Sequence, residues 1–103
     1  MAVDTRYVYL VDDKGGVHAL DKGTGVSVWK QDKLLYRKLT APLLAGGLIA
    51  VGDGFGFIHL LSPEDGAIVG RLETDGSQVL ALVTAAGGIA AQTAKGAVTL
   101  VRF

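Results

Sequence analysis

The feature that most constrains the fold of this chain is an internal repeat of about 40 residues. A shift of 41 positions, without a gap, brings His18 onto His59. A further shift of 40 positions brings Gly56 onto Gly96 in a third copy. Each copy contains short apolar blocks separated by glycine, aspartate and lysine, and 15 of the 103 residues are glycine. A period near ~40 residues with about four short strands predicts the blades of a β-propeller.

The apolar blocks are rich in β-branched and aromatic residues, and turn-forming residues separate them, as in a meander of antiparallel strands. This pattern predicts strands at Tyr7–Val11, Val17–Leu20 and Val26–Lys30 in the first copy, after a frayed first strand at Ala2–Asp4, and at Ala41–Ala45, Leu48–Gly52, Phe57–Leu61 and Ala67–Leu72 in the second. Several of these strands are apolar at successive positions. This pattern is expected when both faces of a sheet are covered.

We therefore predict an all-β fold of antiparallel four-stranded β-propeller blades, with about two and two-thirds blades in the chain. The predicted blades are residues 1–39, 40–79 and 80–103, and the last ends after three strands. Propellers close with about four to eight blades, and an incomplete one leaves faces and edges open. The chain is thus expected to be a piece of a larger propeller or to complete a ring by self-association.

Charge and cysteine content exclude several classes of function. Lysine plus arginine is 10 and aspartate plus glutamate is 10, so the net charge of +0 shows no basic excess for nucleic acid. With no cysteine, the chain has no disulfide, no thiolate zinc site and no cysteine nucleophile.

Residues 1–6 lack the blocks of a signal peptide, and the apolar run Val79–Ala91 is too short to span a bilayer. From these features we expect either a soluble protein of the cytosol or an export signal that lies outside this sequence.

Two histidines and three aspartates recur at positions that invite a metal or acid–base interpretation. His18 and His59 are equivalent, but no partner with ligand-like spacing recurs beside them, so we predict a structural role in hydrogen bonding between packed sheets. Asp12, Asp13 and Asp53 follow strands and precede glycines, which is typical of hairpin turns. No catalytic, cofactor-binding or metal-binding residue is predicted.

The stretch Gly52–Gly56 has the pattern G-x-G-x-G, but it precedes a strand instead of a helix. A phosphate-binding loop requires the helix, so we predict a turn here. Phe55 is expected to be exposed on this turn and to be a minor contact residue.

The joint between the first two copies, Lys33–Lys38, is the best candidate for a protein contact. It should run over the surface, where loops carry binding function. Leu35, Tyr36 and Arg37 are the predicted contact residues, since tyrosine and arginine are enriched at binding hot spots. The alternative is that Leu34 and Leu35 fill the gap between blades while the lysines solvate the joint.

The segment Gly16–Trp29 resembles the repeat of the pyrroloquinoline-quinone-type β-propellers, roughly G-x-V-x-A-L-D-x-x-T-G-x-x-x-W. In this pattern, Thr24 and Gly25 form the turn between the third and fourth strands. Trp29 packs on the small Ala19 and docks one blade against the next, which assigns these four residues to blade docking. The second copy departs from the pattern and has Leu60, Asp65 and Gly70 at the equivalent positions. Its docking contact must therefore be made differently.

Within that class, the chain resembles the BamB family of outer-membrane lipoproteins, on the segments Trp29–Pro42, Val51–His59 and Glu64–Gly66. The resemblance covers essentially the whole chain, as the C-terminal third of an eight-bladed ring. It implies a non-enzymatic periplasmic scaffold of the Bam complex, which assembles β-barrel proteins into the outer membrane. The implied partners are the periplasmic domains of BamA and other Bam subunits, reached through a longer parent with a lipid anchor outside this chain. The family's BamA-contacting loops lie in earlier blades, so no position here inherits that role.

Two alternatives share the same repeat. One is a fragment of a quinone-dependent dehydrogenase, which would need calcium carboxylates and stacked aromatic residues that this sequence does not assemble. The other is a small propeller protein that closes by pairing its open blade edges, so that its stability would depend on concentration.

Overall fold

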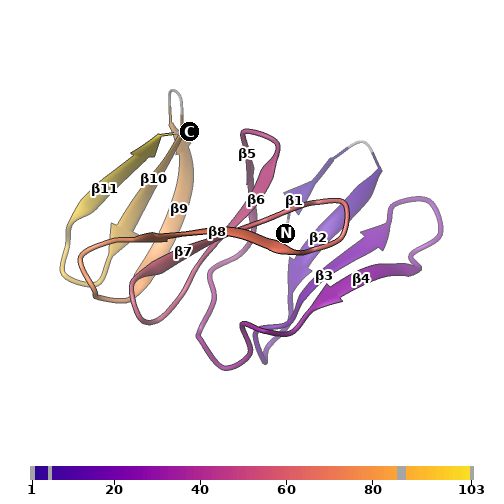
Figure 1. Ribbon diagram of the computed structural model, residues 1–103, viewed down its shortest axis with the longest axis horizontal. Helices are drawn as coiled ribbons and strands as arrows, with labels where there is room; N and C mark the ends of the chain where they lie inside the picture. The colour runs from indigo at the N-terminus through magenta and orange to yellow at the C-terminus, as the bar shows by residue number, and fades with distance from the viewer. Residues whose placement is uncertain (1, 5, 86–87, 103) are drawn as a thin grey trace.

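The structure, a computed structural model, describes residues 2–4, 6–85 and 88–102. Within these residues every regular element is a β-strand, and the strands form three antiparallel sheets that lie side by side (Figure 1). The first sheet contains β1 (Ala2–Val3), β2 (Tyr7–Val11), β3 (Val17–Asp21) and β4 (Ser27–Gln31); the second contains β5 (Leu43–Ala45), β6 (Leu48–Gly52), β7 (Phe57–Leu61) and β8 (Ile68–Glu73); the third contains β9 (Val79–Ala85), β10 (Gly88–Thr93) and β11 (Val98–Arg102).

Each strand pairs with its neighbours in sequence, in the orders β1-β2-β3-β4, β5-β6-β7-β8 and β11-β10-β9. The predicted all-β fold of antiparallel blades is therefore confirmed. The repeat extends to irregularities, because the register of β3 and β4 shifts between Ala19 and Leu20 and that of β7 and β8 shifts between Leu60 and Leu61. The division of the chain at residues 39/40 and 79/80 stays a prediction.

Strand ends differ from the predicted ones where backbone chemistry intervenes. The strand expected from Ala41 begins at Leu43, because Pro42 has no N–H to donate to a ladder. Gly46 and Gly47 form the turn between β5 and β6, and both have positive φ angles, 58° and 78°.

The two inner strands of the second sheet, β6 and β7, are buried on both faces, as their apolar sequences predicted. Two clusters of buried side chains make up the core, one on each face of this sheet. The cluster shared with the first sheet is Tyr9, Val17, Ala19, Leu34, Ile49, Val51 and Leu61; the cluster shared with the third is Ala50, Ile58, Leu60, Val79, Ile89 and Ala91. Alternate residues of β6 and β7 therefore point to opposite clusters, as the pleat of a strand requires.

Two glycines allow the second and third sheets to approach closely. A Cβ atom on Gly52 would lie 2.3 Å from a methyl group of Val79. Gly56 has a φ of 89°, and its Cβ would lie 2.8 Å from the backbone of Gly76. A side chain at either position would force the joint at residues 74–79 away from the second sheet.

In the described residues, no helix has the length and apolar character needed to cross a membrane.

Candidate functional site

The turn between β6 and β7 is built around the buried carboxylate of Asp53, which is 0% exposed. Its Oδ1 accepts hydrogen bonds from the amides of Phe55 and Phe57, at 2.8 and 2.9 Å. Its Oδ2 accepts from His59 Nε2 at 2.7 Å and from Arg37 Nε at 3.0 Å. The turn predicted at Asp53 is thus present, and one side chain connects β6, β7 and the joint.

The turn between β2 and β3 repeats most of this arrangement in the first sheet. Asp12 Oδ1 accepts from the amides of Lys14 and Gly16, at 2.9 and 2.8 Å, and Oδ2 lies 2.7 Å from His18 Nε2. Here both side chains are partly exposed, 29% for Asp12 and 21% for His18. The ion pairs found in the described residues give Asp12 no arginine partner.

The causes of the pKa shifts differ between the two turns, because only the turn at Asp53 is buried. Burial is the largest effect on Asp53 and raises its pKa, but hydrogen bonds from His59, the two amides and Arg37 outweigh it, so the pKa lies below its ordinary value of 3.8. Burial lowers the pKa of His59 from 6.5, and nearby arginine charges lower it further, although Asp53 opposes them. His59 is therefore neutral at pH 7, and its Nε2–H donates to the Asp53 carboxylate, which only accepts. For Asp12, the His18 hydrogen bond and the Gly16 amide hold the pKa well below its usual range.

The prediction that His18 and His59 hydrogen-bond between packed sheets was wrong. Each ring instead bonds to the aspartate at the end of the preceding strand in its own sheet. The recurrence of the aspartate six residues before the histidine in both copies was the signal that pointed to these pairs.

In the third sheet, a threonine–aspartate hydrogen bond takes the place of the Asp–His pair. Thr93, at the position equivalent to Asp53, is 1% exposed, and its hydroxyl donates to Asp75 Oδ2 at 2.7 Å. Asp75 comes from the joint between the second and third sheets. The carboxylate at this turn is thus supplied from outside the hairpin.

The joint between the first two sheets is fixed to the turns of both. The Tyr36 amide donates to the Lys14 carbonyl at 2.7 Å, and the Gly54 amide donates to the Arg37 carbonyl. Tyr36 and Lys38 have φ angles of 63° and 56°, a left-handed backbone that is unfavourable for residues with a side chain. This backbone turns the intervening Arg37 toward the second sheet.

The predicted contact residues lie on and beside this joint. Tyr36 is 76% exposed and Phe55 is 58% exposed. The Arg37 guanidinium lies 5.3 Å from the centre of the Phe55 ring. Leu35 is half-buried, whereas its neighbour Leu34 is buried in the core between the sheets. We call Tyr36, Arg37 and Phe55 the aromatic patch.

Trp29 lies across the interface between the first and second sheets. Its Nε1 donates to the Pro63 carbonyl at 2.9 Å, and its ring lies 6.1 Å from that of Tyr9. A Cβ on Gly66 would lie 2.4 Å from the Trp29 ring, so the indole covers the turn between β7 and β8. Ala19 is paired with Trp29 across the strands and is fully buried.

Thr24 and Gly25 lie in the exposed turn between β3 and β4. Asp21 Oδ1 accepts from the Thr24 amide at 3.0 Å, and the Gly25 amide donates to the Asp21 carbonyl. A Cβ on Gly25 would meet nothing within 4 Å. The assignment of Thr24 and Gly25 to blade docking stays a prediction. In the second sheet, Leu60 pairs with Gly70, and its Cδ1 would lie 3.5 Å from a Cβ there.

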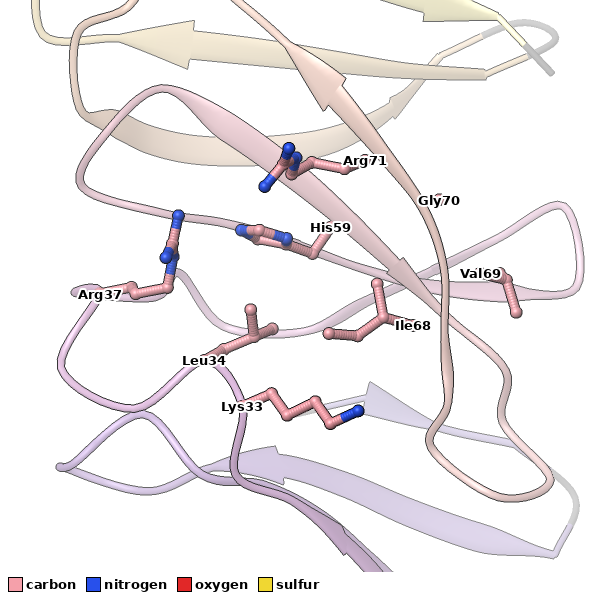
Figure 2. A pocket seen from close by; sticks show the side chains of 8 residues that line it. All are labelled: Lys33, Leu34, Arg37, His59, Ile68, Val69, Gly70 and Arg71. Carbon is pink, nitrogen blue, oxygen red and sulfur yellow. The ribbon is translucent and has the colours of Figure 1, made fainter.

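An open cleft of about 450 Å³ lies between the joint and β8. Figure 2 shows three of its lining residues on the joint and four on β8, with His59 between them. The lining residues are Lys33, Leu34, Arg37, His59, Ile68, Val69, Gly70 and Arg71. The guanidinium of Arg71 lies 4.8 Å from the centre of the Phe57 ring. The repeat aligns Arg71 with Lys30, but this match did not predict that Arg71 faces the joint.

Among the described residues, no group of three or more histidine, cysteine or acidic side chains is placed to hold a metal ion.

Comparison with known proteins gives a consistent result. The model of the family described as outer membrane protein assembly factor BamB matches residues 13–103. A protein of that name from Bordetella pertussis is 39% identical over 103 residues, which are 99% of this chain and 27% of that protein. The Escherichia coli K12 protein of the same name is 43% identical over 75 residues, 73% of this chain and 19% of its own length. The chain thus spans about a quarter or less of these relatives.

Solved structures agree with the fold. The crystal structure of BamB from Moraxella catarrhalis superimposes with a TM-score of 0.90 at 35% identity, over 98% of this chain and 30% of that one. The computationally designed protein Ika8 matches with a TM-score of 0.81 at 17% identity, over 99% of this chain and 32% of the designed one, a likeness of fold alone.

Proposed function

The chain belongs to the family of the outer membrane protein assembly factor BamB, and from this premise we propose that it serves the assembly of β-barrel proteins into the outer membrane. The observation that carries the proposal is the agreement along nearly the whole chain, in sequence with the Bordetella pertussis protein and in backbone with the Moraxella catarrhalis structure. The names of these relatives favour assembly over the dehydrogenase alternative. The whole protein's partners are part of the proposal, because the chain spans only a fraction of each relative.

We propose that the chain acts as a scaffold and not as an enzyme. In support, the two repeated Asp–His pairs are used to hold hairpin turns. Both oxygens of Asp53 are occupied by amides, His59 and Arg37, which leaves the carboxylate no free position for acid–base work. The relatives are named as assembly factors.

The proposed setting is the periplasm, at the outer membrane, with a lipid anchor outside this chain. The proposed partners are the periplasmic domains of BamA and other Bam subunits, bound through the longer parent. Within the chain, we propose that Leu35 and the aromatic patch make a secondary protein contact. Two exposed aromatic rings and an oriented arginine have the composition of a binding hot spot.

The test uses the cell that makes this protein. Removal of the protein should lower the amount of β-barrel proteins in the outer-membrane fraction, and tagged protein should co-purify with BamA. Unchanged amounts together with no Bam subunit in the purified material would contradict the assembly role.

The contact is tested separately with the double variant Tyr36→Ser and Phe55→Ser. We expect it to reduce co-purification of Bam subunits while the protein remains folded. The matched control is Val26→Ser with Val28→Ser, which removes two exposed apolar side chains away from the joint, 63% and 42% exposed. Equal retention by both variants would refute the contact.

A further inference from the structure

The cleft between the joint and β8 concentrates positive charge in a chain whose net charge is +0. Three cationic side chains line it, Lys33, Arg37 and Arg71. Arg37 is neutralised by its ion pair with Asp53, at 3.0 Å. Among the described residues, neither Lys33 nor Arg71 has a carboxylate within 4.0 Å. The cleft therefore presents two cations without an internal counter-charge.

The arginines of the cleft are held in place before any ligand arrives. The Arg71 guanidinium lies over the Phe57 ring at 4.8 Å, a cation–π contact. Arg37 is fixed twice, by Asp53 and by the Phe55 ring at 5.3 Å. A pre-oriented guanidinium loses less side-chain entropy when a carboxylate binds to it. His59, which lies between them, is neutral and adds no competing charge.

The rest of the cleft is aliphatic. Ile68 on β8 is 38% exposed and lies on the same side of the strand as Leu34, which forms the wall on the joint, whereas the Val69 side chain points away from them (Figure 2). Gly70 contributes only backbone to the lining, because a Cβ there would face Leu60 on the side toward the third sheet. A ligand that fits must offer negative charge to Lys33 and Arg71 and an apolar side chain to Ile68.

We propose that this cleft binds an acidic segment of a partner protein. One or two Asp or Glu carboxylates of the segment contact Lys33 and Arg71, and a neighbouring aliphatic side chain packs on Ile68. The limited charge and the apolar wall favour a peptide over a polyphosphate or nucleic acid, which would need a longer basic surface. The proposal does not depend on the assembly role, because it rests on the cleft alone.

The test is binding of a fluorescein-labelled pentapeptide to the chain, measured by fluorescence anisotropy at low salt. The peptide alternates aliphatic residues with two glutamates, Leu-Glu-Val-Glu-Leu, and the comparison peptide has glutamine in place of both glutamates. We expect the glutamate peptide to bind about tenfold more tightly, the effect of losing charge-assisted contacts. Raising the salt concentration should remove the difference. Equal binding of the two peptides would overturn the proposal, and this comparison needs no protein variant.

A protein variant locates the site. Lys33→Gln with Arg71→Gln should weaken binding of the glutamate peptide about tenfold. The control, Lys22→Gln with Lys95→Gln, makes the same change of charge at exposed positions outside the cleft and should change binding less than about twofold. Equal weakening by both pairs would assign the effect to net charge and refute the cleft. Displacement of the peptide by an equal concentration of inorganic phosphate would refute the acidic segment in favour of a small-anion site.

Discussion

The first and second sheets contain the same hydrogen-bonded turn, but it is partly exposed in one and buried in the other. In both, one carboxylate oxygen receives two backbone amides and the other receives a histidine six residues later. In the first sheet, Asp12 and His18 stay partly exposed. In the second, Asp53 and His59 are buried, and Arg37 enters from the joint. A surface hairpin and a buried three-residue cluster therefore arise from one repeated pattern.

The same two sheets also differ in which member of an equivalent cross-strand pair has the large side chain. The first pairs small Ala19 with large Trp29, and the second pairs large Leu60 with Gly70. Trp29 reaches across to the second sheet, whereas Leu60 fills the space beside Gly70 on the face toward the third. The repeat conserves backbone and turn chemistry, while each sheet adapts its volume to the neighbour it meets.

The largest difference between the sheets should appear on removal of the two aspartates. Asp53→Ala leaves His59 and two amides without an acceptor and Arg37 without a counter-charge in a buried place, so we expect a loss of about 3 to 5 kcal/mol in the free energy of unfolding. Asp12→Ala should cost clearly less, because water replaces its contacts. Urea unfolding measures both, and equal losses would show that burial does not distinguish the two turns.

The next effect concerns two equivalent glycines with the same φ of 74°, Gly25 and Gly66. Gly25→Ala should cost about 1 to 2 kcal/mol for a side chain in the left-handed region. Gly66→Ala should cost about 2 to 4 kcal/mol, because the new methyl group also meets the Trp29 ring. Thermal unfolding compares them. Similar losses would mean that the indole yields freely and does not fix the sheet interface.

Two substitutions can give the second sheet the small–large pair that the first sheet has. Gly70→Trp alone should destabilise the protein, since Leu60 occupies the neighbouring space. Leu60→Ala in the same chain should recover part of the loss, with a coupling of about 1 to 2 kcal/mol in a double-mutant cycle. Purely additive losses would argue that the Ala–Trp pair of the first sheet does not transfer.

The smallest effect is a pH dependence specific to the buried pair. The pKa of His59 is lower in the folded protein than its ordinary value of 6.5, so the unfolded chain binds the proton first. The stabilising contribution of His59 should thus be fully present above about pH 6.5 and decline as the pH falls below it. His59→Gln should flatten the decline in urea midpoints across this range. An unchanged slope in the variant would exclude His59 as its cause.

Local sequence was sufficient for the strands and turns. The alternation of apolar blocks with Asp-Gly and Gly-Gly turns predicted β2, β6 and β7 within one residue, because hairpins depend on contacts between near neighbours in the chain. Where a strand boundary differed from the predicted one, as at Pro42, the cause was also local. The partners of His18 and His59 lie six residues away, but sequence did not predict them, because an aspartate after a strand is equally typical of a hairpin turn with no side-chain partner.

By itself, the sequence determined the period, the sheet order and the burial of β6 and β7 on both faces, since spacing along the chain sets which residues share a face. Only the tertiary structure decided that Arg37 meets Asp53, that Trp29 covers Gly66, and that Arg71 faces the joint across a cleft. Each of these contacts joins the second sheet to the first sheet or to the joint between them. Their geometry depends on how far each joint carries the chain and how the sheets pack, and no period in the sequence encodes that distance.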